Sequence, residues 1–154
     1  MSNADSSVSA VELEQIKGFR FRALFGEGMP EWVIDEPEPI GTNSGPSPEQ
    51  LLASAAGYCL AASLDFALGK FREDAGVIKT RAEVTIGRNE KGRKRIAGLH
   101  VTITLGRPEA AFSQLERALA QFEDFCVVAG SIRKGIPVRV TVRDSDDKIL
   151  KDDD

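Results

Sequence analysis

The stretch GPSPEQLLASAAGYCLAASL, residues 45–64, decides how the rest of the chain can be arranged. It begins with strong helix signals: Ser47 can cap the helix and Pro48 suits the first helical position. Gln50 follows Ser47 at the spacing of a capping box. Small side chains dominate the residues that follow, so another segment can approach this helix closely. We expect the helix to extend from residue 48 to about residue 73.

Cys59, one of two cysteines in the chain, lies in the middle of this helix. A free cysteine in such a place is commonly an inert core thiol. A reactive cysteine must instead be held as a thiolate by a nearby cation or helix N-terminus. Cys59 lies eleven residues after Pro48, and the field of a helix terminus fades within one turn. A reactive Cys59 would therefore need a cation from another segment or another subunit.

Strands are indicated elsewhere by alternating apolar and polar residues. We expect them at residues 19–25, 31–35, 81–87, 96–105 and 136–142. Apolar residues at helical spacing predict a second helix that opens at Arg107. Asp124 can cap a third, short helix that ends near Gly135, and its N-terminus can favour the thiolate of Cys126. Because the strands come mostly as antiparallel hairpins, we expect an α+β fold in the order β-β-α-β-β-α-α-β.

The length of 154 residues fits one domain, which we place at residues 19–143. A flexible N-terminal tail (1–18) and a charged C-terminal tail (144–154) are expected to flank it. The chain has no apolar run near the roughly 20 residues that span a bilayer, and no signal-peptide pattern. We therefore expect a cytoplasmic protein without a membrane partner. The net charge of −4 argues against general nucleic-acid binding.

No metal site is expected, because one histidine and two cysteines lack the clustered spacing of metal ligands. The single histidine, His100, shares a strand face with Thr102 and Thr104, which indicates a residue on the sheet surface. The basic segment RNEKGRKR, residues 88–95, is interpreted as a solvated hairpin loop.

The helix motif at 45–64 is followed by FCVVAGSIRKGIPVRVTV at residues 125–142, which places Cys126 67 residues after Cys59. Together these motifs closely resemble the OsmC/Ohr family of osmotically inducible and organic hydroperoxide resistance proteins. The resemblance extends over residues 19–143. It implies an α+β fold in an intertwined homodimer, with antiparallel sheets packed around central helices and active sites at the subunit interface.

The resemblance also implies a thiol-dependent peroxidase whose substrates are hydroperoxides, often organic ones. Cys59 would be the peroxidatic thiol that becomes a sulfenic acid, and Cys126 the resolving thiol that forms a disulfide with it. An external dithiol would then reduce that disulfide, and no metal, haem or flavin cofactor would be needed. Glu49 matches the family's glutamate, ten residues before Cys59. Ten helical residues span about 15 Å, so Glu49 reaches Cys59 only if the helix bends or starts later, or if a partner subunit supplies it.

Two departures from the family pattern affect these assignments. The family peroxidases pair that glutamate with an arginine, but residues 23–49 contain no Arg or Lys. Arg20 and Arg22 are the nearest upstream candidates, and each also fits an exposed strand position. Val127 occupies a position where the family usually has proline.

A second function therefore stays open. The chain would be a non-catalytic OsmC-like dimer that binds a small apolar ligand in the interface pocket. The missing arginine favours this alternative, whereas the presence of Glu49, Cys59 and Cys126 favours the peroxidase.

Overall fold

The computed structural model describes residues 6–153 of the chain. The chain divides into two compact units: the first ends at Leu51 and the second begins at Leu52. In the described part of the chain each unit contains a sheet of its own, with three strands in the first and four in the second. Helix α1, Pro48–Gly69, begins in the first unit and continues into the second.

The sheet of the first unit has the order β1-β2-β3 and is antiparallel throughout. Its strands are β1 (Glu12–Lys17), β2 (Arg20–Leu24) and β3 (Trp32–Ile34). The β2–β3 pairing confirms the expected first hairpin. Strand β1 lies inside the segment that we expected to be a flexible tail, and that expectation is wrong for these six residues. The backbone of β1 pairs with β2 although every side chain of β1 is exposed.

A buried carboxylate organises the loop between β3 and α1. Asp35 accepts hydrogen bonds from the backbone N–H groups of Glu36, Thr42 and Ser44 at 2.9, 2.9 and 3.1 Å. The Thr42 hydroxyl donates a further bond of 2.6 Å. The Thr42 hydroxyl bond is the largest influence that lowers the pKa of Asp35 to about 2, and the backbone donors act in the same direction. Hydrogen bonds to the charged Asp35 carboxylate therefore fix the conformation of the loop that leads into α1.

The predicted capping box is present at the start of α1. The Ser47 N–H donates to Gln50 Oε1 at 2.9 Å, and the Gln50 N–H donates to Ser47 Oγ at 3.3 Å. The helix ends at Gly69, earlier than expected. Arg72 has a φ of 57°, in the left-handed region, which is incompatible with continuing the helix.

The sheet of the second unit has the order β4-β5-β6-β7. Its strands are β4 (Lys79–Arg88), β5 (Lys94–Thr104), β6 (Val138–Arg143) and β7 (Ile149–Asp153). The pairs β4–β5 and β6–β7 are antiparallel, whereas β5 and β6 are parallel. Strand β7 corrects the expectation of a charged C-terminal tail, because its backbone pairs with β6 over Ile149–Asp153.

Short helices make the crossover between β5 and β6. They are the 3-10 turn η2 (Glu109–Ala111), α2 (Leu115–Gln121), the 3-10 turn η3 (Phe122–Phe125) and α3 (Val127–Ile132). The second helix begins at Leu115, later than expected from Arg107. The Glu73 carboxylate engages the N–H groups of Ser113 and Gln114, each at 2.8 Å, which fixes the turn before α2. Residues 6–153 form two sheets and three α-helices, which confirms the predicted α+β class, with β1 and β7 as additional strands.

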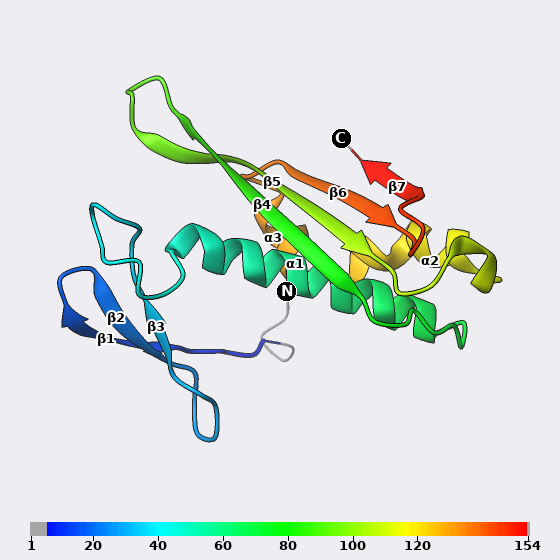
Figure 1. Ribbon diagram of the computed structural model, residues 1–154, viewed down its shortest axis with the longest axis horizontal. Helices are drawn as coiled ribbons and strands as arrows, with labels where there is room; N and C mark the ends of the chain where they lie inside the picture. Colours follow the sequence, from blue (N-terminus) through cyan, green and yellow to red (C-terminus); the bar gives the residue numbers. More distant parts are fainter. Residues whose placement is uncertain (1–5, 154) are drawn as a thin grey trace. The chain divides into compact units, whose positions relative to one another are not determined.

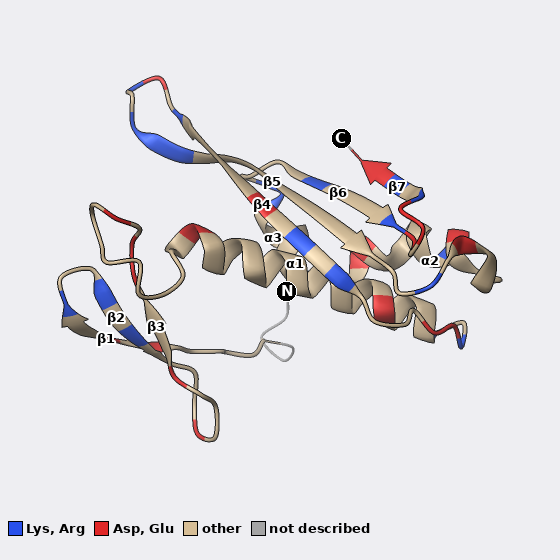
Figure 2. Ribbon diagram, viewed as in Figure 1, with Lys and Arg blue, Asp and Glu red and all other residues tan. Residues whose placement is uncertain are grey.

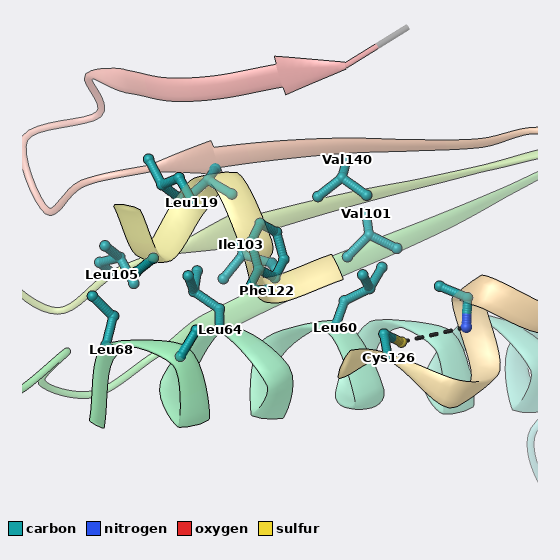
Figure 3. Close-up of a cluster of buried hydrophobic side chains, with 14 of the residues drawn as sticks. Leu60, Leu64, Leu68, Val101, Ile103, Leu105, Leu119, Phe122, Cys126 and Val140 are labelled. Carbon is teal, nitrogen blue, oxygen red and sulfur yellow. Dashed lines mark hydrogen bonds between the residues drawn. The ribbon is translucent and has the colours of Figure 1, made fainter. Parts of the chain in front are cut away.

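The core of the second unit lies between one face of its sheet and the helices (Figure 1). Leu60, Leu64 and Leu68 of α1 point toward the sheet, and Phe122 fills the space beside them (Figure 3). By length and composition alone α1 resembles a membrane-crossing helix, but these leucines are fully buried against the sheet. The core therefore explains the leucines of α1, whereas Tyr58 and Phe66 of the same helix stay exposed.

Candidate active site

An apolar groove of about 610 Å³ opens along α1 in the second unit. Its lining comes from α1, η3 and α3 and consists of Ala55, Tyr58, Cys59, Ala62, Ser63, Phe66, Phe125 and Val128. The α1 residues 55, 59, 62 and 66 recur at helical spacing and so share one face. This spacing is the sequence signal that could have predicted the groove. Cys59 therefore projects from the middle of α1 into an apolar recess.

Cys126 lies beside Cys59 but is shielded from solvent. Its side chain is 2% exposed, whereas Cys59 is half-buried, and both cysteines are free. Cys59 packs against the buried cluster that contains Cys126, and it lies near enough to raise the pKa of the Cys126 thiol. The two thiols that the sequence separates by 67 residues thus meet at the groove.

Cys126 itself, and not Asp124, is the N-cap residue of α3. The Ala129 N–H donates to Cys126 Sγ at 3.3 Å, as the dashed line in Figure 3 marks. Asp124 lies earlier in the chain, in η3, and its side chain is exposed. The sulfur therefore takes the capping role that we expected of the carboxylate.

This capping bond does not make Cys126 acidic. Burial raises the pKa of the Cys126 thiol to about 11, and the neighbouring Cys59 acts in the same direction. The Ala129 N–H opposes both but is outweighed. The expected preference for the thiolate at a helix N-terminus is therefore overturned by desolvation. At neutral pH, Cys126 is a protonated thiol that solvent does not reach.

Aromatic rings form one end of the groove. Phe66 and Phe125 pack edge to face with their ring centroids 5.3 Å apart. The Lys70 ammonium lies over both rings, 4.2 Å from the Phe125 centroid and 5.2 Å from the Phe66 centroid. These residues were missed at the sequence level, because Phe125 and Phe66 meet only in the folded unit.

Ion pairs surround the segment that carries Cys126. Glu123, whose side chain is 13% exposed, pairs with Arg133 just after α3. Its other oxygen accepts from Lys151 Nζ of β7 at 2.9 Å, and Lys151 also pairs with Asp153 at 3.0 Å. These contacts join the residues before and after Cys126 to the last strand of the sheet.

The other predicted site residues belong to the first unit. Arg22 pairs with Glu14 of β1 at 3.6 Å and with Glu31, the residue before β3, at 3.3 Å. Arg20 opens β2 and is half-buried, and Glu49 lies half-buried in the first turn of α1. The second unit thus brings together Cys59 and Cys126, while both arginines and the glutamate are carried by the first.

The remaining polar features lie on the sheet of the second unit. His100 Nε2 lies 2.8 Å from Thr141 Oγ1 on the face away from the core, which fits the predicted surface position. Figure 2 shows Lys and Arg residues at the β4–β5 hairpin, where the basic segment 88–95 forms the turn. Across residues 6–153, three or more His, Cys, Asp or Glu side chains never gather in a way that could hold a metal ion.

Solved structures with the same fold include proteins named for hydroperoxide resistance. An OsmC-like protein of unknown function from Vibrio cholerae gives a TM-score of 0.74 at 15% identity, covering 89% of this chain and 99% of that one. An organic hydroperoxide resistance protein from Elizabethkingia anophelis, with thiocyanate bound, gives 0.70 at 18% identity, with coverages of 90% and 99%. The organic hydroperoxide resistance protein OhrB of Bacillus subtilis gives 0.65 at 16% identity, with coverages of 89% and 98%.

At these identities the structural likeness concerns the fold alone. No match is found among curated proteins. The family model described as OsmC-like protein matches residues 41–141, which is more than half of the chain and includes both cysteines. The chain therefore belongs to the OsmC-like protein family.

Proposed function

We propose that the chain is a thiol-dependent peroxidase that reduces hydroperoxides, organic ones above all. The observation that carries this proposal is the pair of thiols at one apolar groove, one open to it and one buried beside it. An apolar recess suits the carbon skeleton of an organic hydroperoxide. Membership of the OsmC-like family and the names of the structural relatives support the same chemistry.

The reaction proceeds in two steps on the protein. The Cys59 thiolate attacks the terminal oxygen of the hydroperoxide, the O–O bond breaks, and the substrate leaves as an alcohol after taking up a proton. Cys59 is then a sulfenic acid. The Cys126 sulfur attacks the Cys59 sulfur, and the hydroxyl group leaves as water with the Cys126 proton. An external dithiol reduces the resulting disulfide by exchange, so we assign no cofactor.

We assign the peroxidatic role to Cys59 and the resolving role to Cys126 because a ligand in the groove can reach only Cys59. Cys59 lines the groove and meets a ligand there, whereas Cys126 is 2% exposed. Burial also keeps the pKa of Cys126 near 11, so it stays protonated while Cys59 reacts. Cys126 is therefore suited to resolve a sulfenic acid next to it rather than to attack a dissolved peroxide.

We assign the cation that stabilises the Cys59 thiolate to Arg20 or Arg22, oriented by Glu49. Arg22 already pairs with Glu14 and Glu31, whereas no ion pair of Arg20 is found among residues 6–153. Arg20 is therefore our first candidate. The proposal places the working protein in the cytoplasm as a homodimer, where each subunit can contribute these side chains to a site.

The test is a thiol titration before and after one equivalent of cumene hydroperoxide. We expect the wild-type protein to lose both thiols without forming higher oligomers. C59S should lose none, and C126S should form a sulfenic acid at Cys59 that a dimedone probe traps. R20A should react more slowly than R22A if Arg20 supplies the charge. A wild-type protein that retains both thiols would overturn the peroxidase proposal.

The groove also favours the second function, binding of a small apolar ligand without chemistry. Its lining offers few polar groups besides the thiol of Cys59 and the hydroxyls of Tyr58 and Ser63. If the wild-type protein does not react, quenching of Tyr58 fluorescence by apolar ligands should reveal binding in the groove. Ligand binding by C59S at wild-type affinity would then separate a binding role from a catalytic one.

A further inference from the structure

The position of Cys126 depends on a very short helix. Helix α3 has six residues, Val127–Ile132, and Cys126 caps it through its own sulfur. A helix of this length is not stable by itself in water, because nucleation is unfavourable and few hydrogen bonds form. Something outside α3 must therefore hold it in place.

Glu123 makes the contacts that can do so. One oxygen of its carboxylate pairs with Arg133, the residue after α3, and the other accepts from Lys151 Nζ at 2.9 Å. The Glu123 carbonyl also accepts the Cys126 N–H at 3.1 Å. One residue thus binds the start of the segment, its end and strand β7.

The pair of Glu123 with Lys151 is largely shielded from water, whereas the Arg133 side chain, at 38% exposure, reaches solvent. The side chain of Glu123 is 13% exposed and that of Lys151 is 22% exposed. The Lys151 ammonium also lies 5.8 Å from the ring centroid of Phe122, the buried residue that precedes Glu123. An ion pair with little solvent around it is weakly screened by salt and holds its geometry better than an exposed pair.

We propose that Glu123 is a positioning residue for the resolving step: its carboxylate holds the Cys126 segment so that the Cys126 sulfur stays against Cys59. This inference rests on the proposed function. In the step concerned, the bond between the two sulfurs forms as the Cys59 S–O bond breaks. The hydroxyl group leaves with the Cys126 thiol proton as water.

Resolution competes with further oxidation. A sulfenic acid at Cys59 that meets a second hydroperoxide becomes a sulfinic acid, and that hydroperoxide leaves as an alcohol. Capture by Cys126 is intramolecular and does not depend on peroxide concentration, whereas further oxidation does. If Cys126 is displaced from Cys59, disulfide formation slows, and at high peroxide concentration Cys59 should be oxidised to the sulfinic acid instead.

The variants are E123A and E123Q, with E123D as the conservative change that retains the carboxylate. D152N is the matched control, because it removes an ion pair of β7 with Arg139, 2.7 Å long, on the sheet face away from the thiols. In E123A we expect disulfide formation to slow by at least about tenfold, since a displacement of about 1 Å can reduce a proximity-dependent rate by about a hundredfold. E123D should recover part of the rate, and D152N should match the wild type.

Two measurements separate this inference from the peroxidase proposal. The first follows intact mass during titration with cumene hydroperoxide, and we expect E123A to accumulate sulfinic acid while Cys59 is first oxidised at the wild-type rate. The second avoids peroxide: dithiobis(nitrobenzoate) forms a mixed disulfide at Cys59, and attack by Cys126 releases the second nitrothiobenzoate as the protein disulfide forms. This release should slow in E123A and E123Q but not in D152N.

The outcomes are distinct. If the wild-type protein ignores peroxide but E123A still slows the release of nitrothiobenzoate, the peroxidase proposal fails and the positioning role of Glu123 holds. If E123A and E123Q release it at the wild-type rate, the positioning role is wrong. The positioning role is also wrong if E123A slows the initial reaction of Cys59 as much as it slows disulfide formation by Cys126 and also lowers the Tm of thermal unfolding. Glu123 would then only stabilise the fold.

Discussion

Cys126 illustrates at the scale of one residue how burial overrides a favourable local field. Desolvation and the nearby Cys59 raise the pKa of its thiol to about 11 from an ordinary value of 9.0, although the backbone N–H groups of Ala129 and Val128 act to lower it. A thiol whose pKa is raised in the folded state favours folding below the unfolded pKa. That contribution is lost as the pH rises from about 9 toward 11.

We therefore predict that Cys126 in the reduced protein resists alkylation by iodoacetamide at neutral pH. Its reaction should accelerate only as the pH approaches about 11. Peptide-level mass spectrometry after alkylation at stepped pH values checks this, with Cys126 in the urea-unfolded protein as the reference. Rapid alkylation of the folded protein at neutral pH would contradict the described burial.

At the scale of elements, the contact between α1 and β4 depends on Gly57. A Cβ atom at this position would lie 3.1 Å from the Ala82 Cβ and 3.5 Å from Thr80 Cγ2. The absence of a side chain therefore lets the helix approach the sheet, which explains why a residue of low helix propensity occurs in the middle of α1. The sequence pattern had indicated a tight contact here, and the structure confirms it.

We predict that G57L lowers the free energy of unfolding by about 1–3 kcal/mol, because the added side chain overpacks the space against β4. G130A is the matched control: Gly130 lies inside α3, and no other segment comes within 4 Å of the point that an alanine Cβ would occupy. Alanine there should stabilise the helix by up to about 1 kcal/mol. Urea unfolding of both variants measures the difference, and a G57L protein as stable as the wild type would contradict the prediction.

Local signals in the sequence predicted the elements that local chemistry determines. The capping box of α1 and the two antiparallel hairpins depend on residues close together in the chain, and all were correctly placed. Strand β1 was missed because its exposed residues show no buried face, and β7 because its acidic residues suggested a tail. The parallel pairing of β5 with β6 was missed because it joins distant segments.

In the candidate site, too, the features set by local sequence were predicted and those set by tertiary contacts were not. Cys59 and Cys126 were found from their motifs, but their difference in burial depends on tertiary packing. Glu123 gave no signal, since its partners Arg133 and Lys151 lie 10 and 28 residues away. Phe125 escaped notice for the same reason.

At the scale of the whole molecule, each unit leaves large apolar side chains exposed. In the first unit Leu13 is 57% exposed and Trp32 46%; in the second, Tyr58 is 77% exposed and Phe66 56%. Contiguous exposed apolar surface is typical of interfaces, and most soluble oligomers are twofold. We therefore expect a second subunit to cover the groove residues among them, near Cys59.

We predict that the protein is a homodimer at micromolar concentration. Sedimentation velocity should give one species of twice the chain mass of 16.7 kDa. Y58E places a charge on the exposed face of α1 and should dissociate the dimer, whereas R81E, on the polar outer face of β4, should not. A wild-type protein that sediments as a monomer would contradict this prediction.

The parallel pairing of β5 with β6 also delays folding during translation, because β5 cannot pair until β6 has been synthesised. Leu99 pairs with Val138, which lies 39 residues later in the chain. At translation rates of about 5–20 residues per second, β5 waits roughly 2 to 8 seconds for this neighbour. Cys59 waits longer for Cys126. During that interval the nascent chain exposes the apolar helix α1, and Cys59 has no resolving thiol beside it. We therefore expect chaperone binding and irreversible oxidation of Cys59 to occur more in the nascent chain than in the folded protein.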